Sequence, residues 1–127
     1  KFRNREFMEA CVSGCALVAA ADGNITGDEK QKMVKFIQQS EELKVFDTPD
    51  VIKFFNKVAD NFEFDHEIGK GEALKIISKL KKKPDAARLM VRVCCAIGMA
   101  DGDFDNDEKN MVRDICNELG IPAEDFI

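Results

Sequence analysis

Acidic side chains gather in two short segments that have nearly the same order of residues. Residues 21–30 read Ala-Asp-Gly-Asn-Ile-Thr-Gly-Asp-Glu-Lys, and residues 100–109 read Ala-Asp-Gly-Asp-Phe-Asp-Asn-Asp-Glu-Lys. Carboxylates closely spaced in a tight turn are the oxygen ligands that hard cations such as Ca²⁺ prefer. The two segments therefore predict a divalent-cation site, whose candidate ligands are Asp22, Glu29, Asp101, Asp103, Asp105 and Glu108.

The second segment is the better candidate, but it does not match a standard EF-hand. If the loop starts at the first aspartate, its sixth position is Asn106, where an EF-hand needs glycine. Its twelfth position is Val112, where an EF-hand needs a bidentate glutamate. The first segment offers fewer carboxylates, because Asn24 and Thr26 stand at the matching places. Ca²⁺ is favoured among the cations, but its identity is not fixed by this pattern.

Helix capping explains many of the same residues without a ligand. In a capping box, the side chain of the N-cap residue accepts a hydrogen bond from the backbone amide three residues later. The carboxylate of that later residue accepts from the backbone amide of the N-cap residue. Asp22 and Asp101 are not explained in this way, because they follow helix C-termini, where the helix dipole disfavours anions. Capping alone and capping with cation binding both remain open. The residue pairs that fit the box are Thr26 with Glu29 and Asp105 with Glu108.

The five cysteines all lie within apolar helical patterns and form no Cys-x-x-Cys motif. This usage is typical of free, buried thiols in a reducing compartment. A thiol-based sensor or detoxifier is the alternative function. The single histidine, His66, is interpreted as a surface residue. The cysteines are Cys11, Cys15, Cys94, Cys95 and Cys116.

A basic cluster follows the middle of the chain, and it ends a predicted helix with cations that match the helix dipole. It is interpreted either as a solvated helix end or as a contact for anionic lipid or an acidic partner. The net charge of −5 argues against a dedicated nucleic-acid binder. The basic residues are Lys79, Lys81, Lys82, Lys83 and Arg88.

Apolar residues recur at the helical period of 3.6, and no segment alternates with the period of a strand. We expect an all-α, compact bundle of six to seven helices in a single domain over residues 1–127. Two helix–turn–helix units, 3–41 and 85–119, are expected to form an internal pseudo-two-fold repeat linked by helices over about 49–63 and 66–82. The helices are expected over about 3–21, 27–41, 49–63, 66–82, 85–100 and 106–119, with a short last turn within 122–126.

Recognisable catalytic patterns are missing from the sequence. It contains no Ser/His/Asp set, no plausible Cys/His pair, no phosphate-binding glycine loop and no HExxH motif. We therefore expect a protein that is not an enzyme. No signal peptide or membrane-spanning apolar run is visible. Because the chain begins with Lys-Phe-Arg inside a predicted helix, further residues are expected before Lys1.

The two acidic segments with their preceding helices resemble the signature segments of the TerB family of tellurite-resistance proteins. The resemblance rests on Ala-Leu-Val-Ala-Ala-Ala-Asp-Gly-Asn-Ile-Thr-Gly-Asp-Glu-Lys at 16–30 and Cys-Ala-Ile-Gly-Met-Ala-Asp-Gly-Asp-Phe-Asp-Asn-Asp-Glu-Lys at 95–109. It covers essentially the whole chain, including Phe-Met-Glu-Ala-Cys at 7–11 and Leu-Gly-Ile-Pro at 119–122.

The resemblance implies a helical fold with two-fold character and a role in the bacterial ter stress system, which protects against tellurite, phage and pore-forming colicins. It also implies a cytoplasmic protein that works with the membrane protein TerC and with Ca²⁺-binding TerD-type proteins. Peripheral association with the inner face of the membrane is the expectation that the basic cluster adds. A metal-binding role suggested for the family falls here on Asp22, Glu29, Asp101 and Glu108. Under the alternative function, the thiols would meet tellurite or oxidants.

Overall fold

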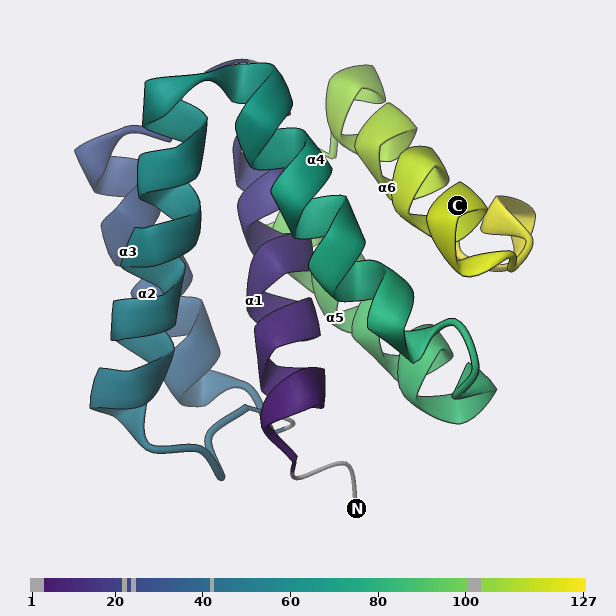
Figure 1. Cartoon of the computed structure of the whole chain (residues 1–127), viewed down its shortest axis with the longest axis horizontal. Helices are drawn as coiled ribbons and strands as arrows, with labels where there is room; N and C mark the ends of the chain where they lie inside the picture. Colours follow the sequence, from purple (N-terminus) through teal and green to yellow (C-terminus); the bar gives the residue numbers. More distant parts are fainter. Residues whose placement is uncertain (1–3, 22, 24, 42, 101–103) are drawn as a thin grey trace.

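The computed structural model describes residues 4–21, 23, 25–41, 43–100 and 104–127. All regular structure within them is helical, which confirms the predicted all-α bundle of six main helices (Figure 1). The last part of the predicted fourth helix is a 3₁₀ turn. The short turn predicted near the C-terminus is also a 3₁₀ helix. The elements are α1 (Arg5–Ala19), α2 (Gly27–Gln39), α3 (Thr48–Phe64), α4 (His66–Ile77), η1 (Ser78–Leu80), α5 (Pro84–Ala100), α6 (Asn106–Leu119) and η2 (Ala123–Asp125).

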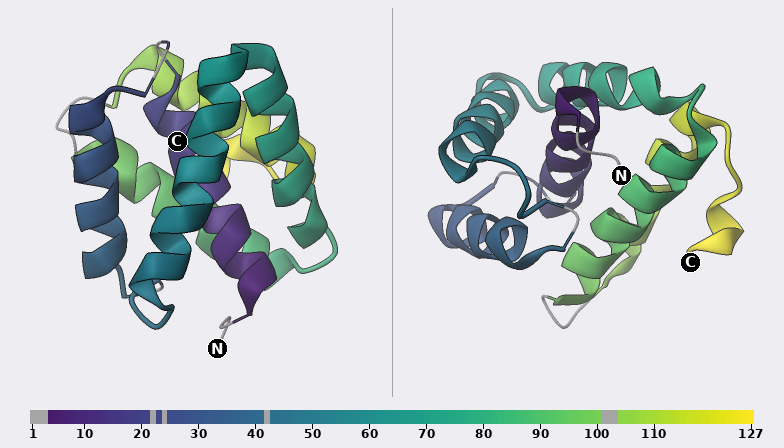
Figure 2. Two further views of the ribbon diagram at one scale, coloured as in Figure 1. Left: turned by 60° about the vertical axis from the view of Figure 1, so that its left-hand side comes forward. Right: turned by 90° about the horizontal axis from the view of Figure 1, so that it is seen from below.

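Helix α1 is the centre of the molecule. Seen from below, it lies between α2 and α3 on one side and α4 and α5 on the other (Figure 2). Every residue from Phe7 to Val18 is buried except Glu9, which is half-buried. The main chain of α1 lies close to α3, α4 and α5. A helix that is apolar nearly all round must be covered on all sides, and the bundle covers it.

A single residue, Asp65, connects α3 to α4 at the corner between them. It follows α3 directly and serves as the N-cap of α4. Its Oδ1 accepts hydrogen bonds from the amides of Glu67 at 2.9 Å and Ile68 at 3.1 Å, which satisfies two free donors of the new helix. A Cβ on Gly69 would lie 2.7 Å from Cα of Phe62, so only glycine allows the two helices to meet this closely.

The predicted internal pseudo-two-fold repeat is not confirmed. Helix α6 lies directly against α5, whereas α2 makes no comparably close main-chain approach to any other element in the described part of the chain. Helix α2 reaches the core instead through the buried side chains of Met33 and Ile37. The two helix pairs therefore differ in packing, although their turns share local features.

A helix that spans a membrane must be both long and apolar. No helix that the structure describes combines the length and the apolarity needed to cross a bilayer.

Candidate functional site

The first acidic turn leads into α2 through a complete capping box. The amide of Thr26 donates to Oε1 of Glu29 at 2.9 Å, and the amide of Glu29 donates to Oγ1 of Thr26 at 3.2 Å. Gly23 has a φ of 139°, a backbone conformation that side chains disfavour, as expected where α1 gives way to the turn. Glu29, a predicted cation ligand, therefore already has a structural task.

The second acidic turn repeats this arrangement at the start of α6. The amide of Asp105 donates to Oε1 of Glu108 at 3.0 Å, and the amide of Glu108 donates to Oδ1 of Asp105 at 2.8 Å. The two N-cap residues also share an extended backbone, with φ and ψ of −79° and 167° at Thr26 and −76° and 177° at Asp105. The predicted capping boxes are thus confirmed in both copies.

The helices that follow these turns start at the same end of the molecule. In the left view of Figure 2, α2 and α6 both begin in the upper part of the molecule, and the α3–α4 corner lies there too. The starts of α2 and α6 therefore lie at the same end of the bundle, on opposite sides of the α3–α4 corner (Figure 1).

The remaining predicted ligands, Asp22, Asp101 and Asp103, lie outside the described residues. Among those that are described, no group of three or more His, Cys, Asp or Glu side chains has a geometry that would hold a metal ion. Each capping carboxylate uses one oxygen in its capping bond, but these carboxylates do not form a ligand set by themselves. A cation at either turn would need the aspartates that precede the caps.

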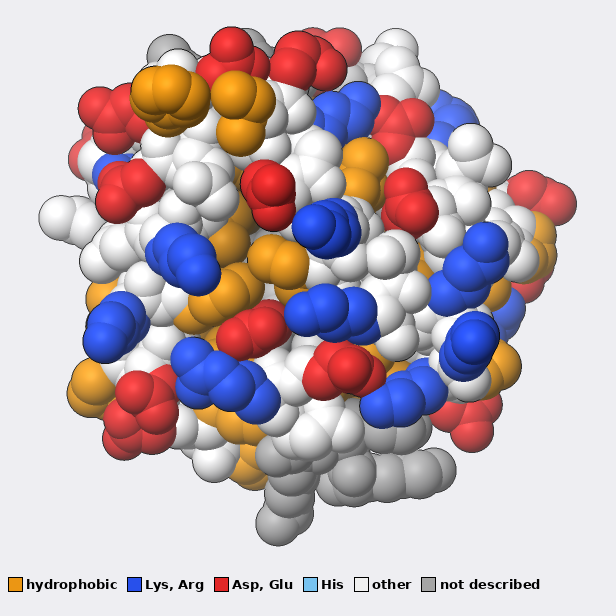
Figure 3. All heavy atoms as spheres, in the orientation of Figure 1, with side chains coloured by type: hydrophobic (Ala, Val, Ile, Leu, Met, Phe, Trp, Pro, Cys, Tyr) orange, Lys and Arg blue, Asp and Glu red, His pale blue; other side chains and the backbone are white. Residues whose placement is uncertain are grey.

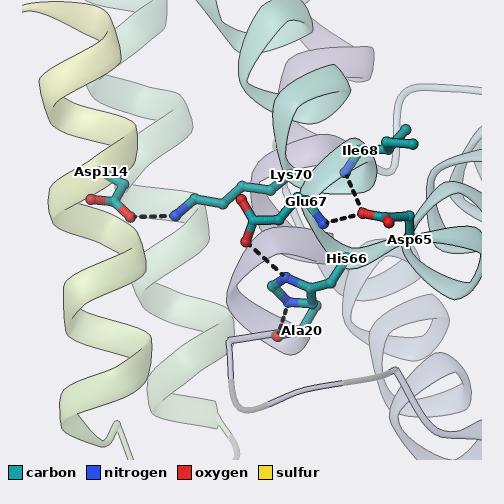
Figure 4. A network of polar contacts seen from close by, with 7 residues as sticks. All are labelled: Ala20, Asp65, His66, Glu67, Ile68, Lys70 and Asp114. Atoms are coloured by element: carbon teal, nitrogen blue, oxygen red, sulfur yellow. Dashed lines mark hydrogen bonds and ion pairs between the residues drawn. The ribbon is translucent and has the colours of Figure 1, made fainter.

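His66 has a role that the sequence did not reveal. Its Nε2 lies 3.1 Å from the carbonyl oxygen of Ala20, the C-cap of α1, as Figure 4 shows. Because a carbonyl only accepts, Nε2 must carry the proton and donate. The ring also packs edge-on against Phe62, with centroids 5.4 Å apart, and Nδ1 is 4.0 Å from Oε1 of Glu67.

The side chain of His66 is 37% exposed, so the residue lies at the surface as interpreted, but it is half-buried and has partners from other elements. It ties the first residue of α4 to the end of α1, next to the first acidic turn. The sequence pattern marks His66 as the first helical residue after an N-cap, but only tertiary packing brings it to Ala20.

Two members of the predicted basic cluster are engaged with acidic side chains. Nζ of Lys83 lies 2.7 Å from Oε1 of Glu6, and Nη2 of Arg88 lies 3.0 Å from Oδ2 of Asp125. The guanidinium of Arg88 also lies 5.1 Å from the ring centroid of Phe126. In Figure 3, Lys and Arg side chains spread over the middle and lower parts of this face and are mixed with acidic ones. The exposed members of the cluster are Lys79, Lys81, Lys82 and Lys83, and Arg88 is half-buried.

The five cysteines are free and buried, as predicted. Cys94 is hydrogen-bonded with Cys15, and this bond, together with burial and the neighbouring thiols, raises the pKa of Cys94 well above its usual value. Its Sγ also lies 3.5 Å from Sδ of Met90. Burial raises the pKa of Cys95, and it raises that of Cys116 to about 11. Because thiolates are the reactive form, these thiols are poor nucleophiles while the protein stays folded.

A small apolar hollow lies beside the first capping box, between α1, α2 and α5. Its volume is about 40 Å³, and Glu29 and Lys32 stand at its edge. A hollow of this size does not admit a drug-sized or cofactor-sized ligand, since such sites occupy roughly 300–1,000 Å³. Its apolar walls are formed by Val18, Ala19, Met33, Phe36, Ile97 and Ala100.

Comparison with known proteins agrees with these local features. Residues 8–127 match the family model described as tellurite resistance protein TerB. The chain is also similar to a tellurium resistance protein TerB from Alcaligenes sp, with 52% identity over 93 residues, which cover 73% of this chain and 76% of that protein. No solved structure matches. The capping boxes and acidic turns thus stand in a sequence that matches this family over nearly its full length, and the chain belongs to the TerB family of tellurite resistance proteins.

Proposed function

We propose that the chain is a non-enzymatic interaction scaffold of the bacterial system that resists tellurite, phage and colicins. The observation that carries this proposal is the pair of matching capping boxes, which fix the start of α2 and of α6 behind an acidic turn. Two rigid helix starts at one end of a bundle give a partner a defined acidic surface. Family membership supports the role in tellurite resistance.

We further propose that a divalent cation, with Ca²⁺ as the first candidate, binds at the acidic turns. The caps position Glu29, Asp105 and Glu108, and the ligand set is completed by Asp22, Asp101 and Asp103. Hard oxygen ligands of this type suit Ca²⁺ and Mg²⁺ better than soft metals. The second turn is the stronger site because it carries more carboxylates.

The partners proposed from the family resemblance are a TerC-like membrane protein and TerD-like proteins, and we do not expect nucleic acid. The protein would then act in the cytoplasm, at times against the inner face of the membrane. The exposed lysines, Lys79, Lys81 and Lys82, provide the matching surface for anionic lipid or for an acidic partner. Each lysine near an anionic surface adds about 1 kcal/mol of attraction.

The cation proposal is tested by adding Ca²⁺, Mg²⁺, Mn²⁺ and Zn²⁺ separately to ¹⁵N-labelled protein and following the amide shifts. We expect saturable shifts within residues 21–30 and 100–109. Asp105→Asn is the most informative variant, because asparagine caps a helix as well as aspartate does but lacks the charge. We expect it to weaken cation binding severalfold while leaving the unfolding transition nearly unchanged.

Asp85→Asn is the matched control, because Asp85 is an exposed aspartate in the first turn of α5. It should leave cation binding unchanged. If none of the four cations produces saturable shifts in either turn, capping is the complete explanation of the motif. Equal loss of affinity in both variants would show a general charge effect instead of a site.

The basic surface is tested separately by flotation with vesicles of phosphatidylglycerol and phosphatidylcholine. We expect binding to the anionic vesicles only, lost when Lys79, Lys81 and Lys82 are replaced by glutamate. If binding to the anionic vesicles persists after this replacement, these lysines do not form the membrane contact.

A further inference from the structure

The α3–α4 corner exposes two large apolar side chains. Phe64, the last residue of α3, is 82% exposed, and Ile68, in the first turn of α4, is 48% exposed. In Figure 3, hydrophobic side chains stand at the upper left, over the part of the molecule where Figure 1 places this corner, with acidic side chains beside them. An exposed phenylalanine contributes nothing to the core, whereas its neighbour Phe62 is 1% exposed and does.

The backbone beneath these side chains is held from several directions. Asp65 caps α4 with two hydrogen bonds from the amides of Glu67 and Ile68. His66 donates to the carbonyl of Ala20. Gly69 sits directly on the main chain of Phe62. A rigid anchor loses little conformational freedom when it is covered, so more of its buried area is converted into affinity.

The charge around the two apolar side chains is acidic. Glu63, Asp65 and Glu67 are exposed on either side of them. The nearby cation Lys70 is held by Asp114 at 2.9 Å. On the α1–α2 side, Glu63 and Lys30 line a hollow of about 270 Å³ together with Ile25 and Ala59. Asp60 and Glu72, one turn further along each helix, are exposed as well.

From this arrangement we propose that the corner is a docking knob, formed by Phe64 and Ile68 and bordered by Glu63, Asp65 and Glu67. Its occupant is a protein surface, such as an amphipathic helix, with an apolar face or pocket flanked by lysine or arginine. Phenylalanine and isoleucine fill such a pocket, and the carboxylates match its rim and speed association. An anionic bilayer or a nucleic acid is disfavoured because the border repels phosphate.

This inference rests on the proposed scaffold function. It specifies the chemistry of one partner's surface, which is apolar and bordered by basic residues. It concerns different residues from the proposed cation ligands and from the basic cluster, although Glu63 lines a hollow with Ile25 and Lys30 of the first acidic segment. The docking proposal and the cation proposal can therefore be tested independently. A failed cation titration would not affect the docking proposal, and a failed docking test would not affect the cation proposal.

Three synthetic helical peptides of equal length serve as probes. The first has a leucine face and a lysine face, the second replaces leucine with serine, and the third replaces lysine with glutamate. We expect only the leucine–lysine peptide to produce saturable amide shifts, centred on residues 60–72. Phe64→Ala should weaken this binding at least tenfold, and Glu63→Gln with Glu67→Gln should reduce its dependence on salt.

Val45→Ala is the matched control, because Val45 is another exposed apolar residue, at 49%, away from the corner. It should bind the peptide as the unchanged protein does. Equal binding of the serine–lysine peptide, or binding unaffected by Phe64→Ala, would overturn the proposal. So would self-association in sedimentation that disappears with Phe64→Ala, or flotation with phosphatidylcholine vesicles that disappears with it, because the occupant would then be a second copy or a membrane.

Discussion

Nε2 of His66 and the carbonyl oxygen of Ala20 lie 3.1 Å apart and join the start of α4 to the end of α1. The contact spans 46 positions of the sequence and ends the central helix with a side-chain donor, as cations and donors commonly do at helix C-termini. It also fixes the corner that carries Phe64. One hydrogen bond thus connects the first acidic turn to the proposed docking knob.

Replacing His66 with alanine should lower the free energy of unfolding by up to about 1 kcal/mol, because the carbonyl of Ala20 loses one of its two donors and keeps the amide of Gly23 at 3.0 Å. Urea denaturation measures this change. Glu67→Gln is the control, since Glu67 is 88% exposed and lies 4.0 Å from the ring, where a charge contact contributes little. A His66→Ala midpoint equal to that of the unchanged protein would mean that the hydrogen bond is not formed in solution.

Removing either N-cap should destabilise the protein by a similar amount. Thr26→Ala and Asp105→Ala are each expected to cost about 1 kcal/mol, because each leaves an amide of the first helical turn without its acceptor. Differential scanning calorimetry in the presence of a chelator isolates this structural effect from cation binding. A loss confined to one of the two variants would contradict the equivalence of the two boxes.

Replacing two of the glycines with alanine should change the free energy of unfolding in opposite directions. A Cβ at Gly14 would collide with Sγ of Cys94 and lie 3.1 Å from Sδ of Met90, so Gly14→Ala should cost roughly 1–3 kcal/mol through overpacking of α1 against α5. Gly71 is an exposed residue within α4 and faces open space. Gly71→Ala should stabilise the protein by roughly 0.5–1 kcal/mol. Chemical denaturation of the pair provides the measurement, and a shared sign would contradict the close contact at Gly14.

The thiols should resist modification in the folded protein. We expect less than one equivalent of reaction with an aromatic disulfide reagent at neutral pH, and reaction of all five cysteines after unfolding in guanidinium. Fast labelling of Cys11, Cys15 or Cys94 in the native state would revive the thiol-sensor hypothesis, because these residues would then be reachable by tellurite or oxidants.

Alkaline pH should weaken the fold through Cys116. Burial raises its pKa from the ordinary value of 9.0 to about 11, so above pH 9 the unfolded chain releases a proton that the folded protein retains. The free energy of unfolding should therefore fall between pH 9 and 11, by roughly 1–3 kcal/mol. Urea titrations under reducing conditions test this, and Cys116→Ala should show a shallower decline. If the free energy of unfolding rises between pH 9 and 11, the pKa of Cys116 is not raised in the folded protein.

The local features of the fold were predictable from the sequence because they depend on neighbouring residues. The capping boxes need only a side chain and an amide three positions apart, and the helices need only the 3.6-residue period. The burial of α1 also followed from its composition, because residues 11–20 leave no polar face for solvent.

The tertiary features were not predictable in the same way. Nothing around His66 indicates that Ala20 will be its acceptor, since the contact depends on how α4 crosses α1. The duplicated motif suggested an internal repeat, but the way α2 packs in the described part of the chain differs from the way α6 packs on α5. In the sequence Phe64 continues the aromatic-rich pattern of α3, and only its exposure in the folded structure separates it from Phe62.

The burial of α1 has a consequence for how the protein is made. Ribosomes complete α1 first, but the helices that cover it, α3, α4 and α5, are finished only when residue 100 has been added. At about 5–20 residues per second, an apolar helix remains uncovered for on the order of ten seconds on each nascent chain. We expect the emerging α1 segment to be a binding site for ribosome-associated chaperones until α5 has emerged.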